Sequence, residues 1–179
     1  MKALVTIIAI IIIILALWWV FLYQNTANAP AENMHAASYK DASYQINGQE
    51  TKLNNGRAET KYGPDMSLTL KTNYFGNEAT GDFNGDGLED IVFLLTQDGG
   101  GSGTFFYVVA ALNTGNGYKG TNAVFLGDRI APQTTEYRDG QIIVNYADRN
   151  PGEPMTASPS LGVSKYLKII DGQLVEQMQ

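Results

Sequence analysis

Oxygen-bearing side chains recur at alternate positions between residues 81 and 95, which read GDFNGDGLEDIVFLL. Counting from Asp82 as position 1, Asn84 is position 3, Asp86 is position 5 and Asp90 is position 9. In a tightly curled loop, this alternation lets carboxylate and amide oxygens point at one centre, as in calcium-binding loops. Hard oxygen ligands suit calcium, and carboxylates this close together would repel one another without a cation.

The two residues after Asp86 complete this pattern. Gly87 at position 6 permits the sharp reversal of the chain, and Leu88 at position 7 can offer its carbonyl oxygen while its apolar side chain packs inward. The sequence therefore predicts one Ca²⁺ ion as cofactor, with a structural role. The alternative is an Asp/Asn/Gly turn that holds no ion. The expected ligands are Asp82, Asn84, Asp86, Leu88 (through its carbonyl) and Asp90.

The loop departs from an EF-hand, because position 12 is Phe93 rather than a bidentate Glu. The apolar run that follows Asp90 is short and ends in turn residues, which indicates a strand. DFNGDGLED followed by a strand resembles the β-loop calcium motif of the FG-GAP and VCBS family. Those proteins repeat the motif from blade to blade and this chain holds one copy, so the resemblance does not imply a propeller. The stretch 74–149 is similar to small exported bacterial proteins without an assigned activity, which favours a stand-alone module.

Catalytic constellations are poorly supported. The chain has no cysteine, and its one histidine, His35, lies in a polar linker. Ser164 and Lys165 are adjacent in an expected strand and therefore point to opposite faces. No catalytic residue is predicted. A carboxylate pair for glycan hydrolysis, drawn from Glu136, Asp148 and Glu153, stays open as an alternative, although nothing in their spacing favours it.

A second candidate for function is the segment 148–159, DRNPGEPMTASP, which contains three prolines and no periodicity. A long, proline-stiffened loop can serve as a recognition surface, and the alternative is a plain crossover between sheets. Asp148, Arg149 and Glu153 are its candidate partner-binding residues. Asp128, Arg129 and Arg149 could form structural ion pairs or an anion site.

Turn and strand signals dominate the chain after residue 40. Asn-Gly and Asp-Gly pairs tolerate the positive φ angles of tight hairpins, and they stand at 47–48, 55–56, 139–140 and 171–172. The apolar segment 104–112 is expected to be a central strand covered on both faces. The fold class is therefore all-β, an antiparallel sandwich or barrel-like sheet of about eight to ten strands. The strands are expected at 67–75, 90–96, 104–112, 122–126, 141–146, 163–170 and 173–176.

Residues 3–23 are uniformly uncharged and apolar, and as a helix they would span roughly 31 Å, the thickness of a hydrocarbon core. They predict one N-terminal transmembrane helix. The alternative is a cleaved signal peptide with Ala27-Asn28-Ala29 as its site, but the apolar stretch is long for one and Pro30 follows at once. Lys2 is the only basic residue before the span, so the N-terminus is expected in the cytoplasm and the remainder outside.

The expected organisation is an anchor over 1–23, a flexible tether over 24–40 and an extracytoplasmic β-domain over 41–179. The net charge of −6 argues against a nucleic-acid partner. The chain is thus expected to be a membrane-anchored, calcium-binding, non-enzymatic β-module in the cell membrane. Its expected partners are the membrane and a protein or glycan of the envelope. The alternatives are an inhibitor or accessory factor of an envelope enzyme, and a carboxylate-based glycan hydrolase.

Overall fold

The structure, a computed structural model, describes Trp18, residues 36–62 and residues 67–178. Apart from Trp18, the expected membrane anchor lies outside the described residues, as does the expected tether up to residue 35. Within the described residues, no helix is long and apolar enough to cross a membrane. The expected domain from residue 41 onward is described almost completely.

The described residues include one short 3-10 helix and twelve β-strands. These elements are η1 (Tyr39–Asp41), β1 (Ser43–Ile46), β2 (Gln49–Lys52), β3 (Arg57–Tyr62), β4 (Leu68–Gly81), β5 (Asp90–Asp98), β6 (Phe105–Asn113), β7 (Tyr118–Gly120), β8 (Val124–Asp128), β9 (Ala131–Arg138), β10 (Gln141–Asp148), β11 (Leu161–Ile170) and β12 (Gln173–Glu176). The all-β prediction is confirmed, with more strands than the eight to ten expected.

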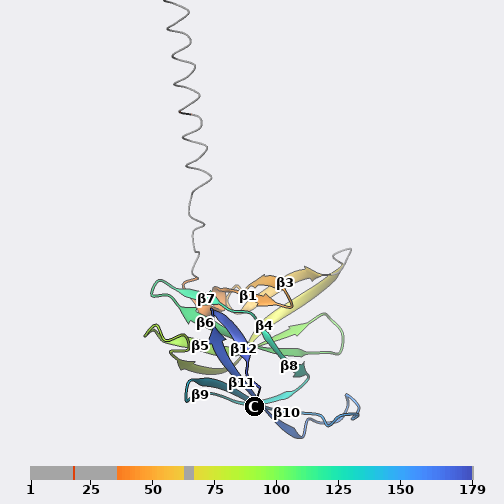
Figure 1. Cartoon of the computed structure of the whole chain (residues 1–179). Coiled ribbons are helices and arrows are strands. Elements are labelled where there is room, and N and C mark those ends of the chain that lie inside the picture. The colour runs from red at the N-terminus through yellow and green to blue at the C-terminus, as the bar shows by residue number, and fades with distance from the viewer. Residues whose placement is uncertain (1–17, 19–35, 63–66, 179) are drawn as a thin grey trace, which may run out of the picture. The chain divides into compact units, whose positions relative to one another are not determined.

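The strands form three antiparallel sheets (Figure 1). The largest runs β3-β4-β5-β6-β7, and β8 also pairs with β6. The second has the order β12-β11-β10-β9, and β1 and β2 form a separate hairpin. No sheet among the described residues closes on itself, so the expected barrel-like sheet does not form there.

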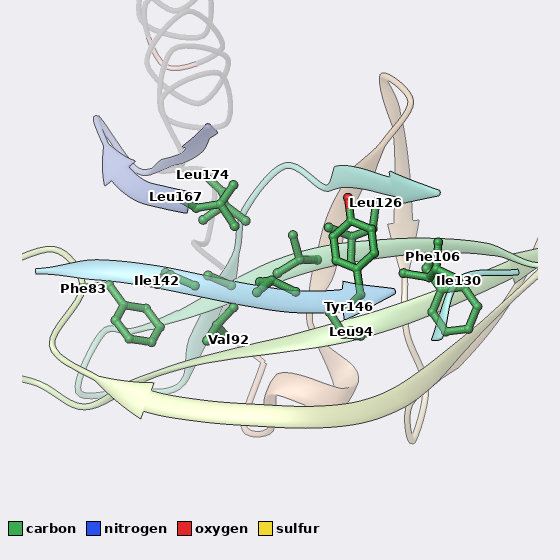
Figure 2. Close-up of a cluster of buried hydrophobic side chains, with 13 residues drawn as sticks. Phe83, Val92, Leu94, Phe106, Leu126, Ile130, Ile142, Tyr146, Leu167 and Leu174 are labelled. Carbon is green, nitrogen blue, oxygen red and sulfur yellow. The ribbon is translucent and has the colours of Figure 1, made fainter. Parts of the chain in front are cut away.

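Strands β5 and β6 are the centre of the domain because both of their faces are buried. On one face, Val92 and Leu94 of β5 and Val108 of β6 pack against Ile142 and the rest of the four-stranded sheet (Figure 2). Side chains of successive residues point to opposite faces of a strand, so the neighbouring residues must find cover on the other side. This confirms that the apolar segment 104–112 is a central strand covered on both faces.

The opposite face of β5 and β6 is covered by η1 and the β1-β2 hairpin. Tyr44 is fully buried there and its ring meets Phe93 edge to face, with ring centroids 5.5 Å apart. The Tyr44 hydroxyl donates to the Tyr39 carbonyl at 2.6 Å, which fixes η1 to the hairpin. A buried tyrosine hydroxyl usually has such a partner, because burying an unpaired hydroxyl costs free energy.

All four predicted two-residue turns adopt the backbone that the sequence requires. Asn47, Asn55, Asp139 and Asp171 each have φ near +50°, and the glycine after each also has a positive φ. Local side-chain chemistry therefore sets these hairpins, because Asn and Asp tolerate the left-handed region better than other residues with a side chain.

Candidate metal loop and recognition loop

The Asp82–Asp90 loop joins two neighbouring antiparallel strands. Strand β4 ends at Gly81 and β5 begins at Asp90, and these two residues are paired at the base of the loop. The prediction that a strand rather than a helix follows the loop is confirmed.

Asp82 organises the backbone of the loop. One carboxylate oxygen, Oδ1, accepts hydrogen bonds from the amides of Gly85 at 2.7 Å and Asp86 at 3.1 Å, and Oδ2 accepts from Gly87 at 2.9 Å. Gly85 and Gly87 have φ of +80° and +83°, a backbone that glycine adopts without steric cost. The chain is therefore curled tightly around the Asp82 side chain.

Asn84 and Asp86 are both exposed and lie against each other. Asn84 Nδ2 donates to Asp86 Oδ2 at 2.9 Å, and Asn84 Oδ1 accepts from the Asp86 amide at 3.0 Å. Asp86 Oδ1 accepts from the Leu88 amide at 2.8 Å. The two bonds from the Asp86 and Leu88 amides are Asx turns, which fold a loop locally with or without an ion.

Asp90 differs from the other three because it is fully buried, with 0% of its surface exposed. Its Oδ2 accepts from the Phe83 amide at 2.9 Å and its Oδ1 from the Asn113 amide at 2.8 Å. Burial raises the pKa of Asp90, the two amides act to lower it, and the charges of Asp86 and Asp82 add to the rise. The negative charges of Asp86 and Asp82 therefore oppose the ionisation of Asp90.

The donor set has the chemistry that calcium requires, but its side chains are not gathered. Within the described residues, no three carboxylate, imidazole or thiolate groups come close enough together to hold a metal ion. Asn84 presents its amide nitrogen to Asp86, and both oxygens of Asp90 already accept amide hydrogens. Coordination would require Asn84 and Asp86 to turn toward Asp82 and to give up hydrogen bonds within the loop.

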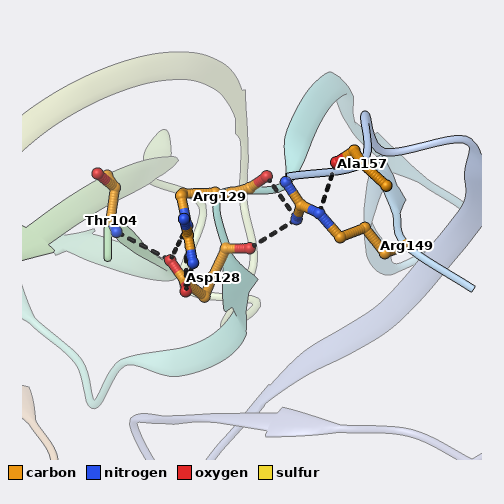
Figure 3. Close-up of polar contacts among 5 residues, drawn as sticks. All are labelled: Thr104, Asp128, Arg129, Arg149 and Ala157. Carbon is orange, nitrogen blue, oxygen red and sulfur yellow. Dashed lines mark hydrogen bonds and ion pairs between the residues drawn. The ribbon is translucent and has the colours of Figure 1, made fainter. Parts of the chain in front are cut away.

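The base of the 148–159 segment is fixed by Arg149 (Figure 3). Its Nε donates to the Ala157 carbonyl at 2.7 Å, and its Nη1 donates to the carbonyls of Asp128 at 3.2 Å and Arg129 at 3.1 Å. The guanidinium thus ties the segment to the turn between β8 and β9. These contacts of Arg149 are hydrogen bonds to main-chain carbonyls, and the ion pair of this region is formed by Arg129 and Asp128.

Asp128 forms the second half of this arrangement. Its carboxylate pairs with the Arg129 guanidinium at 3.0 Å and accepts from the Thr104 amide at 2.9 Å. Burial acts to raise the pKa of Asp128, but the hydrogen bonds from Arg129 and Thr104 and the nearby positive charges bring it below its usual value.

The remainder of the 148–159 segment is exposed and internally bonded. Two successive turns are closed by bonds from the Glu153 amide to the Asn150 carbonyl at 3.0 Å and from the Ala157 amide to the Pro154 carbonyl at 2.8 Å. Glu153 is exposed, and its carboxylate caps the first turn by accepting from the Asn150 amide at 2.8 Å. The segment joins β10 and β11, which are antiparallel neighbours in one sheet, so it is a hairpin loop and not the plain crossover between sheets.

The three acids considered for glycan hydrolysis occupy different environments. Glu136 lies on β9 and accepts from the Thr134 hydroxyl, Asp148 ends β10 and accepts from the Arg149 amide, and Glu153 caps the exposed turn. These contacts are local, and each orders the backbone or strand beside it.

Two residues that support the loop were not identified from the sequence. Asn113 donates its amide to Asp90 and its side-chain Nδ2 to the Glu89 carbonyl at 3.3 Å. Tyr137 donates its hydroxyl to the Asp82 carbonyl at 2.7 Å, and its ring packs on Phe83. Asn113 directly follows a predicted strand, which was a usable signal for a turn, whereas nothing near Tyr137 in the sequence marks its contact.

No protein-family model, curated protein or solved structure matches this chain. The likeness of the Asp82–Asp90 loop to the FG-GAP and VCBS motif therefore rests on the loop residues alone.

Proposed function

We propose that this chain is a membrane-anchored, extracytoplasmic binding module whose β-domain holds one structural calcium ion in the Asp82–Asp90 loop. The anchor is residues 1–23, with the N-terminus in the cytoplasm. The module is not an enzyme, and it presents its β-domain to a protein or glycan of the envelope.

The observation that carries the proposal is the way Asp82 folds the loop. Three amides, those of Gly85, Asp86 and Gly87, converge on its carboxylate, so the alternate side chains of the loop project from one tight curve. Asn84 and Asp86 are exposed on that curve, and to join Asp82 both side chains would rotate and give up the hydrogen bond between them. The Leu88 carbonyl and Asp90 would complete the set.

Calcium would act by relieving the repulsion among the carboxylates of the loop. Burial raises the pKa of Asp90, and the negative charges of Asp86 and Asp82 add to this rise. Extracellular calcium modules bind with dissociation constants of about 10⁻⁴–10⁻³ M. At a few-fold excess of calcium, linkage then adds about 1 kcal/mol to the free energy of unfolding.

The test is calcium titration of the full chain in detergent, by calorimetry and by thermal unfolding in calcium against EGTA. The melting temperature of the wild type is expected to rise with calcium. This rise should be much smaller in the double variant Asn84→Ala with Asp86→Asn. Glu89→Gln is the matched control, because Glu89 is in the same loop but is not among the expected ligands. An equal melting temperature in calcium and EGTA, with no binding heat, would contradict the calcium proposal.

The anchor is tested separately, by sequencing the N-terminus of the mature protein and by extracting membranes. An intact N-terminus that stays with the membrane at high salt is expected. A mature chain that begins near Pro30 would instead establish a cleaved signal peptide.

A second candidate function, inhibition of an envelope enzyme, is favoured by one observation. Arg149 holds the base of an exposed loop on three carbonyls, and a loop fixed before binding loses less entropy when it enters a partner's cleft. Inhibition assays against envelope peptidases and glycan hydrolases, with Met155→Ala as the loop variant, test this candidate. Inhibition by the wild type that is lost in Met155→Ala would support this candidate function.

A further inference from the structure

Strand β11 is paired along more of its inner edge than of its outer edge. Its inner neighbour β10 pairs with residues 161–167, whereas its outer neighbour β12 pairs only with residues 167–170 (Figure 1). One further bond of 2.8 Å, from the Gln177 amide to the Tyr166 carbonyl, ends the contact on the outer side. Among the described residues, no strand or loop pairs with the outer edge over residues 161–165. We call this stretch the open edge.

The backbone groups that face outward at the open edge belong to Gly162 and Ser164. The N–H and C=O of one residue point to the same edge of a strand, and successive residues alternate between the two edges. Because the Tyr166 carbonyl points to the side of β12, the groups of residues 164 and 162 point the same way. Both residues are exposed, so their amide hydrogens and carbonyl oxygens are presented to solvent in a regular row.

Three other outer strands are protected in ways that the open edge is not. On β12, the Asn122 side chain bonds both backbone groups of Leu174, the amide at 2.7 Å and the carbonyl at 2.9 Å. Strand β9 contains Pro132, and β3 exposes charged residues such as Arg57 and Glu59. Prolines and exposed charges are common means of keeping another strand away from a sheet edge. The open edge contains no proline, and its outward-facing residues carry no charge.

The side chains of the open edge alternate in character. Val163 packs against the core cluster between the two larger sheets, and Leu161 lies on the same face and is 40% exposed. Gly162 and Ser164 lie on the opposite face, and no atom stands within 4 Å of a Cβ added to Gly162. A strand added here would place alternate side chains beside Leu161 and Val163 and the others in solvent. Its sequence should therefore alternate between apolar and polar residues.

The two ends of the open edge limit the length of an added strand. At one end, the Lys165 ammonium pairs with the Glu176 carboxylate of β12 at 2.7 Å. At the other end, the Ser160 amide bonds the Asp148 carbonyl at 2.8 Å, which ties the chain back to β10. The stretch between them is about 17 Å long at 3.3–3.4 Å per residue, which suits a segment of about five residues.

A second copy of this chain does not fit the open edge in the register that its own residues require. Two copies joined edge to edge would pair Gly162 of each with Ser164 of the other. The same register would set Ser160 of one copy against Tyr166 of the other, and Gln177 already occupies that place. A short linear segment avoids this overlap because it can turn away before Tyr166, whereas Ser160 is held by its backbone bond to β10.

We propose that the open edge binds an extended polypeptide segment by strand addition, antiparallel to β11 as all neighbours in these sheets are. Gly162 and Ser164 each exchange a pair of backbone hydrogen bonds with one residue of the segment. Leu161 and Val163 select apolar side chains at the residues between. The inference rests on the proposed role as a binding module and commits it to a protein partner, and it requires neither the calcium ion nor the anchor.

The test is hydrogen exchange of the full chain in detergent with EGTA throughout. The probe is a capped peptide of alternating threonine and valine with a lysine at each end. Without the peptide, the Gly162 and Ser164 amides are expected to exchange much faster than the Val163 amide, which faces β10. Peptide at roughly ten times its dissociation constant should slow both by about tenfold. The Leu174 amide, bonded to Asn122, is the internal reference and should not change.

Two N-methylated forms of the peptide test whether its backbone is what binds. In an antiparallel pair, directly opposite residues share a face, so threonines lie opposite Gly162 and Ser164 when the valines face Leu161 and Val163. Methylation of the threonine amides removes the donors that face β11 and should weaken binding at least about tenfold. Methylation of the valine amides alters only the far edge of the peptide and should leave binding within about threefold.

A pair of variants at Gly162 tests the same bonds from the side of the protein. Gly162→Pro removes the outward amide hydrogen, and a proline is tolerated at an edge where its nitrogen faces solvent. It is expected to bind the peptide at least about fivefold more weakly. Gly162→Ala is the matched control, because it keeps the amide hydrogen and its Cβ meets no neighbour, and it should bind like the wild type.

The outcomes are distinct. Slowed exchange at Gly162 and Ser164 that is lost with the threonine-methylated peptide supports the inference. Unchanged exchange at millimolar peptide, or equal binding of the two methylated forms, overturns it. Slow exchange at both amides without peptide, in proportion to the protein concentration, would assign the edge to a second copy and also overturn it. Because EGTA is present throughout, failure here leaves the calcium proposal untouched and leaves a glycan as the partner of the module.

Discussion

Asp90 Oδ1 accepts a hydrogen bond of 2.8 Å from the Asn113 amide, and this bond joins the start of β5 to the end of β6 across 23 residues of sequence. The same carboxylate accepts from the Phe83 amide inside the loop. A fully buried carboxylate is costly unless its oxygens are hydrogen-bonded, and Asp90 meets that condition with backbone donors alone. Asp90 is therefore a structural anchor of the loop, whatever it contributes to an ion.

Asp90→Asn is expected to lower the free energy of unfolding by about 1–3 kcal/mol, because the new amide group would direct N–H hydrogens at an amide donor. Denaturant unfolding in EGTA measures this loss apart from any effect of calcium. Asp98→Asn is the control, since Asp98 makes one exposed bond, to Gly100, at 3.3 Å. Equal stability of the two variants would show that the bonds of Asp90 contribute little.

Asp86→Asn is expected to affect the melting temperature in opposite ways without calcium and with calcium. In EGTA the variant keeps an acceptor for the Leu88 amide and loses a negative charge near Asp82, so its melting temperature should stay within about 1 °C or rise. In calcium it loses a charged ligand, and at least half of the calcium-induced rise should disappear. Thermal unfolding under both conditions measures the difference. An undiminished calcium effect would show that the negative charge of Asp86 is not needed for calcium binding, since an asparagine carbonyl can also coordinate calcium.

The features predicted correctly from sequence are those that depend on local chemistry. The positive φ of Asn47 and Asp139 follows from the Asn-Gly and Asp-Gly pairs themselves. The burial of β6 follows from its continuous apolar run.

The features that were missed depend on contacts distant in sequence. Strand β4 was expected to end at residue 75 but continues to Gly81 through two shifts of register, and its polar end, GNEATG, carries no strand signal. Strand β9 was missed because it is a polar edge strand that contains Pro132. The Asn113 and Tyr137 contacts to the loop were missed for the same reason, since only the pairing of distant strands creates them.

Gly120 is predicted to be irreplaceable for steric reasons. Its φ lies outside the left-handed region, but a Cβ there would overlap the Ser43 carbonyl oxygen and lie 2.7 Å from the Tyr44 ring. Gly120→Ala is therefore expected to cost about 1–3 kcal/mol or more, since the buried Tyr44 cannot retreat without disturbing its neighbours. Gly162→Ala is the control, because nothing lies within 4 Å of its added Cβ and its φ is also ordinary. Equal denaturation midpoints for both variants would contradict this prediction.

Arg149→Lys is expected to loosen the 148–159 loop although it preserves the charge. A lysine ammonium cannot reproduce the planar guanidinium that serves the carbonyls of Asp128, Arg129 and Ala157 together. We expect a loss of about 1–3 kcal/mol in unfolding free energy and faster proteolytic cleavage between residues 150 and 160. Arg138→Lys, at an exposed strand end, is the control and should leave both measurements unchanged. Slow cleavage of the Arg149 variant would mean that the two internal turns hold the loop without it.

The shared bond of Tyr39 and Tyr74 to Glu78 predicts a loss of stability in alkali. Burial, followed by the hydrogen bond to Glu78, raises the pKa of Tyr74 from 10.0 to about 12 and raises the pKa of Tyr39 further. Because the folded state holds these protons more tightly than the unfolded state, their contribution is complete below pH 10 and is lost as the pH rises toward and beyond 12.

Tyrosinate absorbance and denaturant unfolding between neutral pH and pH 12 measure both sides of this linkage. The double variant Tyr39→Phe with Tyr74→Phe keeps the ring contacts and removes both titrations. It is expected to lose about 1 kcal/mol at neutral pH, because the exposed bonds to Glu78 are gone, and to lose less stability than the wild type above pH 10. Parallel curves for the two proteins through the alkaline range would show that these phenols are not linked to folding. Their protons would then leave as readily from the folded chain as from the unfolded one.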